Sequence, residues 1–249
     1  MTHALPQPTD ETGAAAAAAA VRDLNTVFIM TSTRKPSSVT QQSEGGVHVQ
    51  FRDLNLPHDA TGEVAWLHKD ITRNLARAGI TAQVQLSSSM FPTVDITLPT
   101  TGDVRRFASL VESGMSDLRR VGLHLRRAMI EAGVQARVLA WDRDGTIELL
   151  RMEVGAALDL YKVLGGAPGQ PAGIDTETWS GVLEFADHLA NAIHRASGLS
   201  LFVDPKPACG SCREPNRMVF SSMDADEAKA LTAAVVRRGA PAQTSSEAS

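Results

Sequence analysis

The chain has 249 residues, of which 43% are hydrophobic and 4% aromatic, so aliphatic side chains and alanine must form most of its core. This length is sufficient for one large domain or two ordinary ones. The formal net charge of −4 argues against a protein that coats nucleic acid through a general excess of positive charge. No stretch approaches the roughly 18 consecutive apolar residues that indicate a membrane span. Abundant alanine and a strong excess of arginine over lysine indicate a high-GC bacterial genome.

Both ends of the chain are expected to be disordered tails. Residues 1–22 are of low complexity and lead into an alanine run at 14–20, and an isolated short helix is marginal in water even where alanine favours it. Residues 239–249 are rich in alanine, serine and threonine. The N-terminal segment has no basic leader and carries Asp10 and Glu11, which is not typical of a secretory signal peptide. A cytoplasmic location is therefore expected.

Hairpins and helices alternate in the first half of the sequence. Val64, Leu67 and Ile71 recur at a spacing of three to four residues, which predicts a helix with one apolar face. Gly79 follows that helix, and glycine can take the left-handed conformation that ends a helix. The elements expected here are strands at 26–30 and 47–54, a helix at 61–78, strands at 80–86 and 94–98, and a helix at 102–113.

The same order of elements returns in the second half. Gly133 and Gly198 each stand between a predicted helix and a predicted strand, as Gly79 does. Asp175 and Asp224 are expected N-caps, because an aspartate carboxylate accepts hydrogen bonds from the unpaired amides of a first turn. The elements expected here are a helix at 116–132, strands at 134–140 and 146–151, helices at 153–164 and 176–196, strands at 199–203 and 218–221, and a helix at 224–237.

This pattern predicts an α+β protein in which recurring β-hairpin-plus-helix units form a largely antiparallel sheet covered by helices, with disordered termini. The junction of helix, glycine and strand occurs three times in the same order, which indicates an internal repeat. A break near Gly114 gives two halves of similar length. The expected organisation is a tail at 1–22, a half at 23–114, a half with the cysteine pair at 115–238, and a tail at 239–249.

The two cysteines of the chain, Cys209 and Cys212, are separated by two residues, a spacing that lets both thiolates bind one zinc ion. A structural zinc site takes four ligands, so the other two would come from His188 or His194 with a further residue, or from a second subunit. The same spacing is typical of redox pairs, but these need a helix directly afterwards, and here Pro215 and a predicted strand follow. The third interpretation is an ordinary hairpin loop with two thiols.

A basic helix face is the second candidate site. At about 100° per residue, four arginines and one histidine of the predicted helix 116–132 fall on one broad side, with apolar residues on the other. Arginine forms paired hydrogen bonds to phosphates, so this face is a hypothetical nucleic-acid contact, with an ordinary solvated helix face as its alternative. The residues concerned are Arg119, Arg120, His124, Arg126 and Arg127.

Recognised catalytic motifs are missing from the sequence. The glycine-rich segment 165–169 lacks the lysine of a phosphate-binding loop, and no Gly-x-Ser-x-Gly or His-Glu-x-x-His motif occurs. Asp142 and Asp144 flank a predicted hairpin turn, where aspartate is favoured for structural reasons. The leading hypothesis is a non-enzymatic intracellular binding or assembly protein, with a protein partner or self-association and no membrane association. The alternatives are a nucleic-acid-associated regulator and an enzyme whose site is dispersed along the chain.

Overall fold

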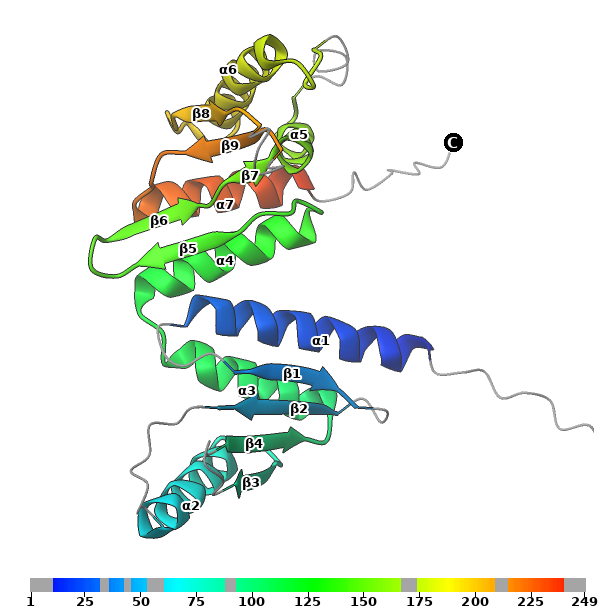
Figure 1. The fold of residues 1–249 in the computed structure, drawn as a ribbon, viewed down its shortest axis with the longest axis vertical. Coiled ribbons are helices and arrows are strands. Elements are labelled where there is room, and N and C mark those ends of the chain that lie inside the picture. Colours follow the sequence, from blue (N-terminus) through cyan, green and yellow to red (C-terminus); the bar gives the residue numbers. More distant parts are fainter. Residues whose placement is uncertain are drawn as a thin grey trace, which may run out of the picture. The chain divides into compact units, whose positions relative to one another are not determined.

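A computed structural model describes residues 11–31, 36–42, 46–52, 61–87, 93–166, 174–208 and 215–239 of the chain. Its helices and small antiparallel sheets confirm the expected α+β class (Figure 1). The chain divides into two compact units, an N-terminal unit of residues 1–115 and a C-terminal unit of residues 116–249.

The N-terminal unit contains one sheet in which every pair of neighbouring strands is antiparallel, in the order β1-β2-β4-β3. The centre of its register places Val49 of β2 opposite Ile96 of β4, which in turn lies opposite Val84 of β3. The elements in chain order are α1 (Glu11–Met30), β1 (Ser38–Gln41), β2 (Val47–Phe51), α2 (Thr61–Arg77), β3 (Gln83–Ser87), β4 (Thr93–Leu98) and α3 (Thr101–Ser113).

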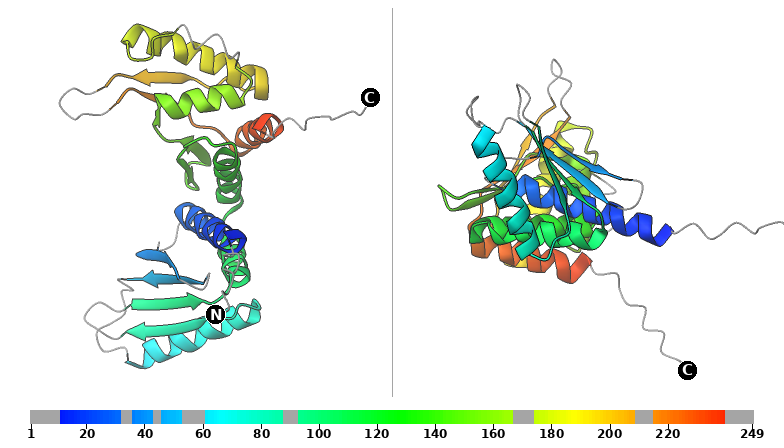
Figure 2. Two further views of the ribbon diagram at one scale, coloured as in Figure 1. Left: turned by 90° about the vertical axis from the view of Figure 1, so that its right-hand side faces the viewer. Right: turned by 90° about the horizontal axis from the view of Figure 1, so that it is seen from below.

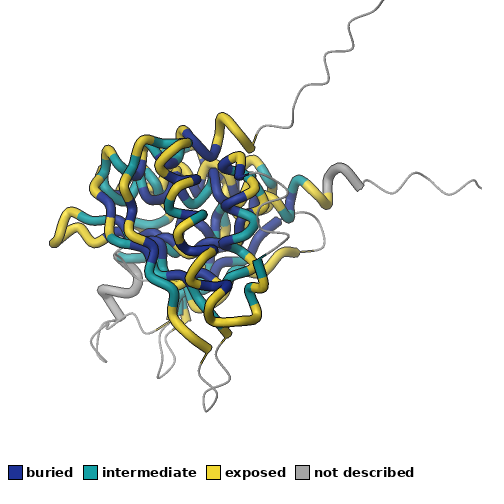
Figure 3. The backbone as a smooth tube through the Cα atoms, turned by 90° about the horizontal axis from the view of Figure 1, so that it is seen from above, coloured by how far each residue is buried: buried dark blue, intermediate teal, exposed yellow. Residues whose placement is uncertain are grey.

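The core of this unit lies between the sheet and its helices. Alternate residues of β4 are buried, as the period of two along a strand requires, and Figure 3 marks such buried positions along the chain. Helix α1 packs against α3 and β1, and α2 packs against β3 at the far side of the unit (Figures 1 and 2). The ring of Phe28 in α1 makes edge contacts with Phe51 and Phe107, at centroid distances of 5.8 and 6.1 Å.

The first helix corrects two sequence predictions. The alanine run was expected to belong to a disordered tail and residues 26–30 to form a strand, but both lie in α1. Ala17, Ala20 and Leu24 are spaced at three to four residues and are buried, so the alanines form the packed face of a helix that tertiary contacts stabilise. Val27 at its C-terminal end is also buried and continues the same helical period. The first strand of the hairpin is instead β1, which lies between the two strands expected at 26–30 and 47–54.

The C-terminal unit contains a two-stranded sheet, β5-β6, and a three-stranded sheet, β7-β9-β8. The expected helices are present, but two strands are shifted along the chain: the strand expected at 134–140 is observed at 138–141, and that expected at 199–203 is observed at 203–206. β7 is an additional strand that the sequence did not predict. The elements in chain order are α4 (Asp117–Glu131), β5 (Val138–Trp141), β6 (Thr146–Leu149), β7 (Met152–Glu153), α5 (Val154–Val163), α6 (Trp179–Ser197), β8 (Val203–Lys206), β9 (Arg217–Phe220) and α7 (Ala225–Gly239).

A common register joins the two small sheets. Ile147 of β6 exchanges two backbone hydrogen bonds of 2.8 Å with Met223, which follows β9. Met152 of β7 lies opposite Met218 of β9. Met152 is five positions after Ile147, and Met218 is five positions before Met223, so both contacts belong to one antiparallel pairing that is interrupted between them. The strands are therefore ordered β5, then β6 with β7, then β9, then β8.

The helix ends of both units follow from local sequence. Gly79, Gly133 and Gly198 have φ values of +68°, +78° and +78°, so the expected left-handed helix ends are confirmed. Asp224 is confirmed as an N-cap, because its carboxylate accepts hydrogen bonds from the amides of the first turn of α7 at 2.8 Å. The prediction that Asp175 is the N-cap of α6 is wrong. That helix begins at Trp179, and the hydroxyl of Thr178 accepts from the Gly181 amide at 3.2 Å.

Candidate functional site

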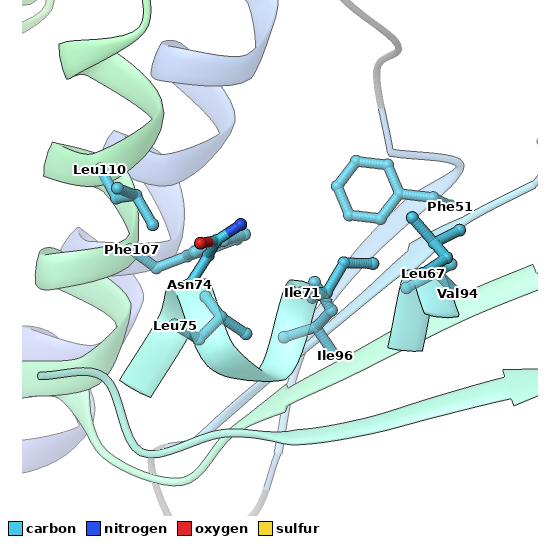
Figure 4. A pocket seen from close by; sticks show the side chains of 9 residues that line it. All are labelled: Phe51, Leu67, Ile71, Asn74, Leu75, Val94, Ile96, Phe107 and Leu110. Atoms are coloured by element: carbon cyan, nitrogen blue, oxygen red, sulfur yellow. The ribbon is translucent and has the colours of Figure 1, made fainter. Parts of the chain in front are cut away.

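An apolar groove in the N-terminal unit lies between α2 and α3, over the sheet face formed by β2 and β4, and has a volume of about 330 Å³. Figure 4 shows side chains that project into it from all four elements. One polar residue, Asn74, stands among eight apolar ones. The lining residues are Phe51, Leu67, Ile71, Asn74, Leu75, Val94, Ile96, Phe107 and Leu110.

The groove follows from the pairing of β2 with β4 and from the apolar residues that α2 and α3 place over that face of the sheet. Phe51 and Val94 are directly opposite in the register of β2 and β4, so their side chains share one face of the sheet. Leu67 and Ile71 are four residues apart on α2 and occupy one side of that helix. Phe107 lies in α3 and is buried at the floor of the groove by its contact with Phe28. The wall on the α3 side remains accessible, because Leu110 is 36% exposed.

A hydrogen-bonded carboxylate fixes the two helical walls. Asp103, in the first turn of α3, is 2% exposed and accepts hydrogen bonds from the amide of Thr81 at 2.9 Å and the hydroxyl of Thr100 at 2.6 Å. Thr81 lies just beyond the C-terminal end of α2, so Asp103 connects that end to the start of α3. Arg106 adds an ion pair at 3.1 Å, from a side chain that is mostly in solvent.

The same contacts change the protonation of Asp103. The hydrogen bond from Thr100, with further contributions from the Thr81 amide and Arg106, lowers the pKa of the Asp103 carboxyl below its usual value against the opposing effect of burial. The carboxylate is thus the stable form at neutral pH. Asp103 therefore holds the end of α2 against the start of α3, and it is not one of the residues that line the groove.

The predicted basic face lies on α4, and two of its arginines pair with acidic residues of the same unit. Arg119 Nε lies 2.5 Å from Asp142 Oδ2, and Arg120 forms an ion pair with Asp117. Asp142, which the sequence placed in a hairpin turn, also accepts from the Ser116 hydroxyl. This hydrogen bond and then Arg119 lower the pKa of Asp142. Much of the positive charge at the start of α4 is therefore compensated locally.

Arg126 has a different environment. Its Nε and Nη1 atoms are buried and have no hydrogen-bond partner within the described part of the chain. Burial, and then the charge of Arg137, lower the pKa of the Arg126 guanidinium. His124 is exposed and Arg127 half-buried on the same helix. The structure thus distributes the five predicted residues over several environments of α4.

A second recess, of about 400 Å³, lies in the C-terminal unit. Arg137, Arg151 and Arg217 line it together with Leu150 and Glu153. Leu150 and Arg151 belong to the stretch where the pairing of β6–β7 with β9 is interrupted, so the recess coincides with that opening. Its lining is mainly cationic, and an anion suits it better than an apolar molecule.

The predicted metal ligands Cys209 and Cys212 lie outside the described residues. Among the residues that are described, no group of three or more histidine, cysteine, aspartate or glutamate side chains is arranged to hold a metal ion. His188 Nε2 lies 3.8 Å from a carboxylate oxygen of Glu184, and His194 Nδ1 lies 3.3 Å from the Leu199 carbonyl. Zinc binding by the cysteine pair stays a prediction.

Comparisons with protein families, with curated proteins and with solved structures found no match to this chain. Within the described residues, no helix has both the length and the apolar character needed to cross a membrane.

Sequence reasoning missed the apolar groove, although it placed most of its lining on the correct elements. The stripe with Leu67 and Ile71 was recognised as an apolar helix face, and an apolar face is normally assigned to the core. The exposed position of Leu110 shows that part of this surface remains uncovered. The available signal was Phe107 and Leu110, which place two large apolar side chains three residues apart on the next helix.

Proposed function

We propose that the protein is a non-enzymatic binding protein that holds an apolar ligand in the groove of its N-terminal unit. One observation carries the proposal: of the nine described residues that line the groove, eight are apolar and none is titratable. Such a lining supplies no acid, base or nucleophile, but it removes apolar ligand surface from water. A volume of about 330 Å³ falls at the lower end of the range of roughly 300–1,000 Å³ for ligand sites.

Replacing Leu110 by glutamate is expected to weaken binding of the neutral fluorescent probe N-phenyl-1-naphthylamine by about tenfold or more, because a charge would then face an apolar ligand. Leu110 is partly exposed, so the substitution should leave the fold intact. The measurement is a fluorescence titration of the full chain.

Leu183→Glu is the matched control, since Leu183 is a helical leucine of the C-terminal unit with 45% exposure. It should bind the probe within about twofold of the wild-type affinity, because Leu183 does not line the groove and surface substitutions usually have small effects. Equal losses in both variants would assign the probe to another surface, and no binding by the wild-type chain would refute the proposal.

We further propose that the two units arose by an internal duplication and share one arrangement of helices and strands. In each, an opening helix packs against the closing helix, α1 against α3 and α4 against α7. The strand orders correspond as well, with β1-β2-β4-β3 in one unit and β5, β6 with β7, β9, β8 in the other. In each, the middle helix packs on the last strand in this order, α2 on β3 and α6 on β8.

A zinc ion at Cys209 and Cys212 is a separate proposal, open to elemental analysis.

Nucleic-acid binding through the basic residues is the second candidate. The observation in its favour is that the buried Nε and Nη1 atoms of Arg126, which lie near the charge of Arg137, have no hydrogen-bond partner among the described residues, since a phosphate that reached them would satisfy these donors. Replacing both arginines by alanine should weaken binding of a fluorescein-labelled DNA duplex about tenfold in low salt and reduce the salt dependence. Arg73→Ala with Arg77→Ala is the charge-matched control. Fluorescence anisotropy gives both affinities, and equal losses in the two double variants would count against a specific site.

A further inference from the structure

Under the proposed correspondence of the two units, helix α5 of the C-terminal unit has no counterpart among the described residues of the N-terminal unit. α5 packs against α6, α7, β7 and β9. Under the proposed correspondence of the two units, these four elements match α2, α3, β2 and β4. Those are the elements that line the apolar groove. One unit thus has a helix in this position, and the other has a groove there.

The side chains of α5 show what such a position accepts. Ala157, Leu160, Tyr161 and Leu164 are all at most 2% exposed and are spaced as one apolar stripe of a helix. The Tyr161 ring contacts Phe185 of α6 edge to face, at a centroid distance of 5.9 Å. On the same helix, Asp159 and Lys162 form an ion pair between partly exposed side chains.

The groove itself has the form of a helix-binding surface. It is bounded by two helices and a sheet face and is open along the side where Asn74 and Leu110 are accessible. Recognition of an amphipathic helix in an apolar groove uses side chains at a spacing of three and four residues as anchors. α5 presents such anchors to its own unit.

The charged residues at the edge of the groove indicate which residues should stand beside the apolar stripe of a bound helix. Arg77 follows Asn74 by three residues on α2, and Arg106 precedes Leu110 by four residues on α3, so each lies one helical turn from a lining residue. Asp70 also lies one turn from Asn74 and accepts a hydrogen bond from it at 3.5 Å, so the rim is mixed in charge, with the two arginines in excess among these described residues. Arg77 is exposed, and the Arg106 side chain is 55% exposed. An occupant with acidic residues beside its apolar stripe would complement these arginines. α5 has this character, with Glu153 before it and Asp159 within it.

We propose that the groove of the N-terminal unit binds a short amphipathic helix of a partner protein, with an apolar stripe like that of α5 and acidic flanks. This inference rests on the proposed function, since it names the ligand of the same groove. A second copy of the chain is a poorer occupant, because α5 is already buried within its own unit.

The test uses a capped, fluorescein-labelled peptide of residues 152–166 and the full chain. Anisotropy should show saturable binding at least about tenfold tighter than that of the same peptide with Leu160→Asp and Leu164→Asp, which loses two anchors. Leu110→Glu in the protein should weaken binding by a similar factor, while Leu183→Glu should leave it unchanged. The unlabelled peptide should also displace N-phenyl-1-naphthylamine.

Two results would overturn the inference. One is a result in which the probe binds in the groove but the peptide neither binds there nor displaces the probe. That result would leave the proposed function standing with a different ligand. The other is peptide binding that Leu110→Glu does not weaken, which would place the peptide elsewhere, for example in exchange with α5 itself. Failure of the neutral probe to bind at all would refute the proposed function instead, so the two failures are distinguishable.

Discussion

Phe185→Ala is expected to lower the free energy of unfolding by about 3–5 kcal/mol, because it removes a fully buried aromatic side chain and leaves a cavity. Phe185 of α6 is 0% exposed and forms the edge contact with Tyr161 of α5. The loss should appear in the transition of the C-terminal unit during denaturant unfolding. A change below about 1 kcal/mol would show that α5 and α6 are not packed together as described.

Tyr161→Phe provides the matched control for this core. The Tyr161 ring is 1% exposed, and its hydroxyl is buried without a hydrogen-bond partner among the described residues. Removing an unsatisfied hydroxyl while keeping the ring should leave the free energy of unfolding unchanged or raise it by about 1 kcal/mol. A clear loss of stability in this variant would reveal a partner for the hydroxyl.

Asp103→Asn is expected to lower the free energy of unfolding at pH 7 by about 2–3 kcal/mol, because the amide replaces a buried carboxylate that accepts three hydrogen bonds. The pKa of Asp103 is lower in the folded chain than in the unfolded one. Its contribution is therefore fully present above the unfolded pKa of about 3.9 and is lost as the pH falls through the folded pKa.

The measurement is denaturant unfolding of the wild-type chain and Asp103→Asn from pH 7 down to the acid limit of folding. The difference between them should shrink at pH values below about 4. Asp142 also has a lowered pKa, but it titrates in both proteins, so the difference isolates Asp103. A difference that does not depend on pH would contradict the proposed protonation of Asp103.

Local sequence determined the helices that follow a strong apolar period. The helix expected at 116–132 is observed as α4, Asp117–Glu131, and that expected at 102–113 as α3, Thr101–Ser113. The serine and threonine before them are N-caps whose side chains accept from first-turn amides. Glycines at three helix ends were predicted for the same reason, since a positive φ leaves few alternatives to glycine.

Tertiary context decided the elements that the sequence did not predict correctly. The β-branched residues near the end of α1 favour a strand locally, but the packing of α1 on α3 stabilises the helical conformation. β7 has only two residues and exists because β9 lies beside it. The groove could not be predicted from local sequence either, because it depends on how α2 and α3 are placed over the sheet as well as on the residue types.

The most direct test of the binding groove is a methyl NMR titration of the full chain, labelled at isoleucine, with N-phenyl-1-naphthylamine. Ile71 and Ile96 line the groove, whereas Ile147 and Ile193 lie in the core of the other unit. The signals of Ile71 and Ile96 are expected to shift and to saturate at the affinity found by fluorescence, while those of Ile147 and Ile193 stay in place. Shifts confined to Ile147 and Ile193, or no shift at saturating probe, would contradict this expectation.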